Sequence, residues 1–189
     1  RGWTGSNTPA SWSSTPNALE RIAFTTKDHL LLIDDFAPNG TFTDVKKLHA
    51  TAERVIRAQG NQSGRFRMRA DSTLAGSLPP RGLILATGED IPKGQSLQAR
   101  LVLIQIGPGD VNVNRLTSAQ ACAESGVYAL VMAAFTQRLA RLADCGGLSS
   151  RLGARRKELR AEAIKVSHTR TPDNIASLMI GAVEFLDFS

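Results

Sequence analysis

The sequence predicts an α/β fold with a parallel sheet, followed by a C-terminal α-helical region. Two apolar runs, LLLI at 30–33 and LILAT at 83–87, have the composition of strands buried on both faces, which is typical of parallel sheets. From residue 117 onwards the apolar residues recur at helical spacing instead. We therefore divide the chain into an α/β part, residues 1–115, and a helical part, residues 116–189.

The composition is that of a globular protein, with 42% hydrophobic and 21% charged residues. No apolar run approaches the ~20 residues of a membrane span, and the first residues lack the apolar core of a secretory signal. The widely spaced Cys122 and Cys145 do not suggest a disulfide framework or a zinc site. We therefore expect a cytoplasmic protein with no membrane partner. The net charge of +6 favours an anionic partner such as nucleic acid, with a solubilising surface as the alternative.

Residues that typically begin or end helices mark the first elements of the chain. Thr15-Pro16 predicts a helix start, because threonine caps helices and proline suits their first turn. An apolar strand is expected at 29–34. Asp44 is expected to cap the next helix, about 45–59, which Gly60-Asn61 would end.

The segment GRFRMRAD at 64–71 alternates strictly, which predicts a strand with its arginines on one face and Phe66 and Met68 on the other. Two further apolar strands are expected at 82–87 and 100–106. The remaining elements are helices with a glycine-rich hinge at 145–150, and they are expected at 117–143, 151–166 and 171–188.

The run LLLIDD places two carboxylates where a buried strand ends. The carboxyl end of a parallel strand is where open α/β sheets bind ligands, and in P-loop ATPases this position is the Walker B element. Asp34 would then hold Mg²⁺ through its water shell, and Asp35 would orient or polarise the attacking water. The alternative is a strand that simply ends in an acidic turn.

The run LILATGED repeats the pattern with a hydroxyl. If the two strands are neighbours, Thr87 emerges near the same ligand, at the position where AAA+ and related ATPases sense the γ-phosphate. Glu89 is a candidate nucleotide-binding residue of this edge. Taken alone, the stretch also fits a Thr-Gly turn between strands.

Several arginines are candidates for contacts with phosphate. Arg100, before the strand expected at 100–106, is a candidate finger that stabilises transition-state charge, although an ordinary ion pair is the alternative. Basic residues between the two strands could grip DNA phosphates, namely Arg65, Arg67, Arg69 and Arg81. Phe66 could stack on a base, but we expect it to pack inward. An edge strand protected by charge is the alternative for this segment.

The pattern G-x-x-x-x-G-K-[ST] of a phosphate-binding loop is absent from the sequence. That loop precedes the Walker B strand in P-loop proteins, whereas 28 residues precede the strand here and the first residue is not Met. We therefore expect either a piece of a longer ATPase or no ATPase.

Five segments carry a resemblance to a known family: SWSSTPNALERIAF, LLLIDDFAP, AERVIRAQGNQSGRFRMRAD, PPRGLILATGEDIPKGQSLQARLVLIQI and the tail HTRTPDNIASLMIGAVEFLDF. Together they resemble the ATPase region of primase-helicase-like proteins carried by phages, plasmids and integrated elements of actinobacteria. The likeness covers roughly residues 11–106 and the final helical segment.

The resemblance implies a partial RecA/AAA+-like P-loop core, use of ATP and Mg²⁺, and a role in replicating mobile DNA, with a ring-shaped homo-oligomer as a possible assembly. It places Asp34 and Asp35 at Walker B, Thr87 near the sensor position and Arg100 just before the last core strand. Without the phosphate loop, this chain alone should bind nucleotide poorly or not at all. A non-enzymatic basic DNA-binding module and a degraded ATPase remnant are the alternatives.

Overall fold

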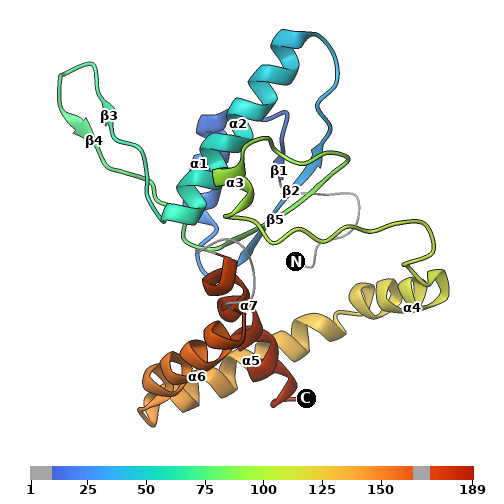
Figure 1. Ribbon diagram of the computed structural model, residues 1–189. Coiled ribbons are helices and arrows are strands. Elements are labelled where there is room, and N and C mark those ends of the chain that lie inside the picture. Colours follow the sequence, from blue (N-terminus) through green and yellow to red (C-terminus); the bar gives the residue numbers. More distant parts are fainter. Residues whose placement is uncertain (1–9, 164–170) are drawn as a thin grey trace. The chain divides into compact units, whose positions relative to one another are not determined.

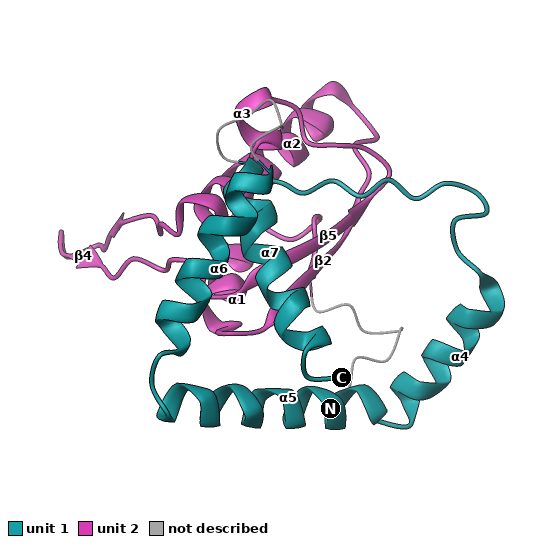
Figure 2. Ribbon diagram, turned by 60° about the horizontal axis from the view of Figure 1, so that its bottom comes forward, with its two compact units in different colours: residues 1–4, 101–189 teal, residues 5–100 magenta. Residues whose placement is uncertain are grey.

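The computed structural model describes residues 10–163 and 171–189. The described residues form two compact units that divide between Arg100 and Leu101 (Figure 2). The unit that ends at Arg100, magenta in Figure 2, contains every described strand, and the unit that begins at Leu101, teal in Figure 2, contains helices and no described strand. The α/β class with a small parallel sheet is therefore confirmed. The units divide earlier than residue 115, where the sequence suggested a boundary.

The sheet has three parallel strands in the order β1-β2-β5. They are β1 (Ala10–Ser11), β2 (Leu30–Phe36) and β5 (Leu83–Gly88). Leu30 of β2 lies opposite Leu83 of β5, and the pairing continues to Ile33 opposite Ala86. The two apolar runs are thus parallel neighbours, as predicted, and their carboxyl ends share one edge of the sheet.

Helices α1 (Pro16–Thr25) and α2 (Phe42–Asn61) accompany the sheet (Figure 1). Thr15 caps α1 with its side-chain oxygen, which accepts from the N–H of Ala18 at 3.3 Å. The cap of α2 is Thr41 rather than Asp44. Asp44 occupies the third helical position and completes a capping box, since its carboxylate accepts from the Thr41 N–H at 3.2 Å.

The core lies on one face of the sheet. Leu31, Ile33 and Phe36 of β2 are buried together with apolar residues of both helices, which are Leu19, Ala23, Ala52, Val55 and Ile56. Leu30 remains 50% exposed, Leu83 57% and Leu85 49%. The expectation that both faces of these strands are buried is therefore wrong, because in the described residues the helices of this unit cover only one face.

The segment after α2 forms a hairpin of β3 (Arg67–Met68) and β4 (Leu74–Ala75), which projects from the rest of its unit (Figure 1). The strand is much shorter than the predicted 64–71. The predicted inward packing of Phe66 and Met68 is also wrong, since these side chains are 67% and 71% exposed. Residues 10–163 and 171–189 provide no layer that covers these two side chains.

The predicted strand at 100–106 does not form. A short helix, α3 (Gln95–Gln98), leads directly into Arg100, and residues 101–106 are unpaired. Their apolar side chains are exposed, with Ile104 at 79%. A segment with strand-like composition forms a strand only when it pairs with a neighbouring strand. Among the described residues, no strand pairs with this segment.

The unit that begins at Leu101 contains α4 (Val113–Glu124), α5 (Val127–Asp144), α6 (Leu148–Ala163) and α7 (Thr171–Leu186). The single helix predicted at 117–143 is broken at Gly126, whose φ of +80° a helix cannot continue. Gly146 and Gly147 make the predicted hinge, also with positive φ. Phe135 of α5 packs edge-on against Phe185 of α7 at 5.3 Å between ring centroids. Residues 164–166 of the predicted helix lie outside the described residues.

Among the helices of the described ranges, none combines the length and the continuous apolar character needed to cross a bilayer.

Candidate functional site

The pairing of β2 and β5 changes register at the two aspartates. Ile33 lies opposite Ala86 and Phe36 opposite Gly88, so Asp34 and Asp35 together face Thr87 alone. This arrangement is a β-bulge, and Asp35 adopts φ +65° within it. Aspartate is one of the few residues that tolerate this left-handed conformation.

The bulge allows Phe36 to enter the buried core while Asp35 stays outside it. In a regular strand side chains alternate, so the face that holds Leu31 and Ile33 would next receive residue 35. The extra residue shifts this phase, and Phe36 is buried instead, 5.7 Å from the Trp12 ring and 5.4 Å from the His49 ring. Asp34 is half-buried and Asp35 is exposed at the sheet edge.

Thr87 joins both aspartates. Its hydroxyl donates to Oδ1 of Asp34, and its Oγ1 accepts from the N–H of Asp35 at 3.2 Å. The predicted convergence of the acidic and the hydroxyl-bearing strand ends is therefore present. Glu89 follows at the same edge, where its N–H donates to the carbonyl of Phe36 at 3.1 Å.

The described residues do not neutralise the acidic edge. Within the described part of the chain, neither Asp34 nor Asp35 has a Lys, Arg or His nitrogen within 4.0 Å of its carboxylate. Two uncompensated carboxylates on a chain of net charge +6 favour a cationic ligand.

The donor set suits one kind of cation. No group of three or more His, Cys, Asp or Glu side chains gathers among the described residues, so these residues offer no complete protein cage. Mg²⁺ does not require one, since it keeps several waters and uses one or two carboxylates together with substrate phosphates. The bulge aspartates therefore fit Mg²⁺ bound with a phosphate-bearing ligand.

Arg100 lies far from this edge. Its guanidinium donates to the Ser96 carbonyl and to Oδ1 of Asn61 at 3.2 Å, at the C-terminal end of α2. That end lies beside the start of β5, because Gln59 donates to the carbonyl of Gly82 at 2.7 Å. Arg100 thus sits toward the amino edge of the sheet, and the geometry does not bring it to Asp34 of the same chain. The predicted position before a core strand is wrong, because the strand is absent.

The four arginines considered for DNA have different surroundings. Arg67 donates to Glu20 at 2.5 Å and to Asn17 at 2.7 Å. Arg81 donates to the Phe24 carbonyl at 2.9 Å and stacks over the Phe24 ring at 4.2 Å. Arg69 reaches Thr73 at 3.5 Å, and Arg65 is exposed. Arg67 thus differs from Arg65 and Arg69, since its side chain is engaged by α1, and contact of these arginines with DNA stays a prediction.

Glu20 is a residue that the sequence analysis missed. It is only 8% exposed, and its two carboxylate oxygens accept from Arg54 of α2 and Arg67 of the hairpin, each at 2.5 Å. Burial raises the pKa of the Glu20 carboxyl, but the hydrogen bonds and charges of the two arginines outweigh burial, so its pKa lies below the ordinary value. A signal was present: Glu20 lies three residues before Ala23 and four before Phe24, which places it on the same side of the helix as these apolar residues.

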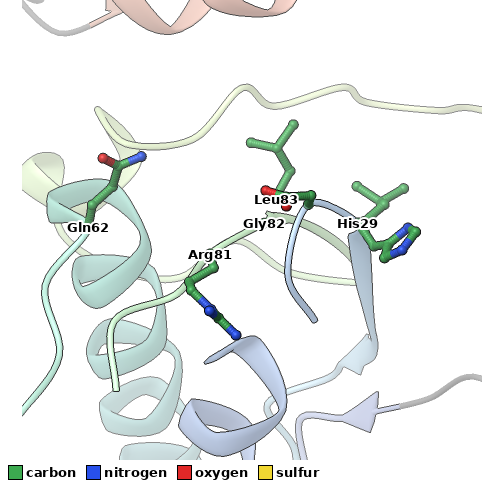
Figure 3. Close-up of a pocket in the computed structure, with 7 residues that line it drawn as sticks. His29, Gln62, Arg81, Gly82 and Leu83 are labelled. Carbon is green, nitrogen blue, oxygen red and sulfur yellow. The ribbon is translucent and has the colours of Figure 1, made fainter. Parts of the chain in front are cut away.

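A hollow lies at the amino edge of the sheet, opposite the acidic edge (Figure 3). It encloses about 400 Å³ and is lined by Asp28, His29, Leu30, Gln62, Arg81, Gly82 and Leu83. Figure 3 shows the Arg81 side chain pointing toward the end of α1, where it meets the Phe24 carbonyl. Arg81 is thus used within the fold, and Asp28 pairs with Lys27 at 3.6 Å, so the carboxyl edge is the better candidate site.

A scan against models of protein families, a search of curated proteins and a search of solved structures each gave no match to this chain. The geometry of the site is thus the basis for the function proposed below.

Proposed function

We propose that this chain supplies the Mg²⁺ side of an ATP-hydrolysing site, as part of a RecA/AAA+-like ATPase in a primase-helicase-like protein that acts on mobile DNA. The observation that carries the proposal is the bulge at the carboxyl edge, where Asp34 and Asp35 meet Thr87 without a cationic partner among the described residues. The resemblance to primase-helicase-like proteins supports the choice of nucleotide and DNA.

Each residue has a role that its position supports. Bound Mg²⁺ would neutralise charge on the β- and γ-phosphates. Asp34 would accept hydrogen bonds from the waters that surround the metal, and its carboxylate is held in orientation by the Thr87 hydroxyl. Asp35, exposed and turned by the bulge, polarises the attacking water as a general base. Thr87 senses the γ-phosphate and is hydrogen-bonded to Asp34. Glu89 contributes further negative charge near the nucleotide.

The proposal requires a phosphate-binding loop from residues outside this sequence, because the 189 residues contain no such pattern. Two features leave room for a further strand. In the described residues β5 is paired on one side only, and residues 101–106 have strand-like composition without a partner. On this proposal the chain alone does not hydrolyse ATP.

The partners follow from the same proposal. DNA is the macromolecular substrate, consistent with the net charge of +6. A homo-oligomeric ring would allow Arg100 to act on the nucleotide of a neighbouring subunit. A replication ATPase of this kind acts in the cytoplasm.

The test is ATP hydrolysis by the full-length protein, with and without DNA. Asp35→Asn should lower kcat by roughly 10²- to 10⁴-fold. The matched control is Asp28→Asn, because Asp28 also has positive φ, +58°, and is exposed, but precedes β2 at the opposite edge. Equal activity of wild type and Asp35→Asn would reject the proposal, and so would a full-length protein without ATPase activity.

A further inference from the structure

Asp34 and Asp35 are held in different ways. The Thr87 hydroxyl donates to the Asp34 carboxylate, whereas at Asp35 the backbone N–H is the group bonded to Thr87. No described residue hydrogen-bonds to the Asp35 carboxylate. The direction of this carboxylate therefore depends on the backbone of Asp35, which has φ +65°. Because a general base acts only when it is closely aligned with its water, the groups that fix this backbone matter to the chemistry.

Phe36, the residue after Asp35, is anchored by two other rings. Its side chain is buried, and its ring lies edge-on to Trp12 at 5.7 Å between centroids and to His49 at 5.4 Å. The interplanar angles of 80° and 72° are those of T-shaped pairs, an arrangement that aromatic rings prefer. We call Trp12, Phe36 and His49 the aromatic clamp. Trp12 follows β1 and His49 belongs to α2, so the clamp ties the end of β2 to two other elements of its unit.

The backbone on both sides of Asp35 is attached as well. The N–H of Trp12 donates to the carbonyl of Asp34 at 3.2 Å, and the N–H of Glu89 donates to the carbonyl of Phe36 at 3.1 Å. Gly88 lies opposite Phe36, and a Cβ added to this glycine would lie 2.7 Å from both Cβ and the carbonyl oxygen of Phe36. This close approach of β5 leaves Phe36 little room to move while its ring stays in the clamp.

The nitrogens of the clamp contribute nothing to it. Nε1 of Trp12 and both ring nitrogens of His49 are buried and have no hydrogen-bond partner among the described residues. Buried polar atoms without a partner lower stability, so hydrogen bonding does not explain a histidine at this position. What His49 offers Phe36 is the shape of a flat ring. A phenyl ring in its place should therefore serve as well.

We propose that Trp12 and His49 are positioning residues, which hold Asp35 in the orientation of a general base by fixing Phe36. This deepens the proposed function, on which it rests for the role of Asp35. Asp34 has its own bonds to the Thr87 hydroxyl and to the backbone of Trp12. The clamp should therefore govern the chemical step and leave the binding of nucleotide unchanged.

The first experiment follows the Asp35 amide by hydrogen–deuterium exchange in the full-length protein without nucleotide. This N–H donates to Oγ1 of Thr87 at 3.2 Å, so its exchange reports whether the bulge keeps its geometry. His49→Ala should speed the exchange roughly 10-fold or more, and His49→Phe should return it to the wild-type rate. The matched control is Val55→Ala, because Val55 is buried on the same helix and its truncation leaves all three rings in place.

Circular dichroism verifies that each variant is folded. His49→Leu is the second variant if His49→Ala does not fold, because leucine fills the space without supplying a flat ring. The Asp35 amide of His49→Leu should also exchange faster than that of the wild type.

The second experiment measures steady-state ATP hydrolysis. His49→Ala should lower kcat roughly 10- to 100-fold with the KM for ATP unchanged, as expected for a displaced general base. Val55→Ala should keep the wild-type kcat, and His49→Phe should recover most of what His49→Ala loses. Because His49 acts through Asp35, adding His49→Ala to Asp35→Asn should cause no further loss. A residue that only stabilises the fold would lower kcat alike in both backgrounds.

Two results would overturn the inference. One is equal exchange of the Asp35 amide in His49→Ala and Val55→Ala, and the other is the same loss of kcat from His49→Ala with and without Asp35→Asn. A full-length protein without ATPase activity would contradict the proposed function, and the exchange of the Asp35 amide would then decide by itself whether the clamp fixes the bulge.

Discussion

Two acidic sites of the α/β unit differ in their partners. Glu20 is buried, and two arginines neutralise it. Asp34 and Asp35 stand at the sheet edge. There the Thr87 hydroxyl donates to the Asp34 carboxylate and accepts from the backbone N–H of Asp35. A carboxylate that the fold itself neutralises is structural, whereas carboxylates left without a cation by the described residues are available to a ligand. The predictions below test this contrast, beginning with the largest expected effect on stability.

Replacement of Glu20 should be the most damaging. Glu20→Gln leaves Arg54 and Arg67 without their shared charge in a buried place, so the free energy of unfolding should fall by about 2 to 4 kcal/mol. The matched control is Glu53→Gln, since Glu53 pairs with Arg57 on the surface of α2 at 2.8 Å and should cost less than about 0.5 kcal/mol. Urea unfolding measures both, and equal losses would show that Glu20 is not structural.

Low pH should remove the contribution of ionised Glu20 to the free energy of unfolding. The pKa of Glu20 is lower in the folded than in the unfolded state, so its stabilisation is complete above the unfolded pKa and is lost as pH falls through the folded pKa. From about pH 6 to about pH 3, wild type should lose more stability than Glu20→Gln. Asp44 and Asp71 also have lowered pKa values, and comparison with the variant isolates Glu20 from them. Parallel pH profiles would contradict the assignment.

The bulge aspartates should matter much less to stability. Asp35→Ala places a less tolerant residue at φ +65° and should cost about 1 kcal/mol. Asp35→Asn keeps a side chain suited to this conformation and should change stability by less than about 0.5 kcal/mol. Thermal unfolding of both variants provides the measurement. A large loss in Asp35→Asn would mean that the charge itself holds the fold together.

The smallest expected effect is a slight gain. Asp34→Asn relieves repulsion between neighbouring carboxylates and keeps an oxygen that can accept from Thr87, so stability should rise by a few tenths of a kcal/mol, about the size of a like-charge pair on a surface. Differential scanning calorimetry at low salt is the appropriate measurement. A clear destabilisation would show that the ionised Asp34 has a structural partner.

Local patterns in the sequence were sufficient to predict much of this fold. The helix start at Thr15-Pro16, the two apolar strands and the glycine hinge depend on nearby residues, and each is present. The segment 101–106 has the same apolar composition but forms no strand, because pairing depends on a neighbour that composition does not report. The exposure of Phe66 was missed for the same reason, since packing depends on what lies opposite.

The candidate site was predictable in part. The juxtaposition of Asp34 and Thr87 follows from two parallel strands ending at one edge. The bulge does not follow, since a one-residue change of register leaves no mark in the order LLLIDDF. Nor could the sequence show that Glu20, on α1, would capture one of the three alternating arginines.

The most direct test of the account is binding of Mn²⁺–ATP to the full-length protein, followed by electron paramagnetic resonance of the bound Mn²⁺. If Asp34 holds the metal through its water shell, Asp34→Asn should weaken binding roughly 10- to 100-fold. Asp28→Asn, which lies before the amino end of β2, should leave binding unchanged. Equal affinity of Asp34→Asn and wild type would contradict the assignment of the acidic bulge as a metal–nucleotide site.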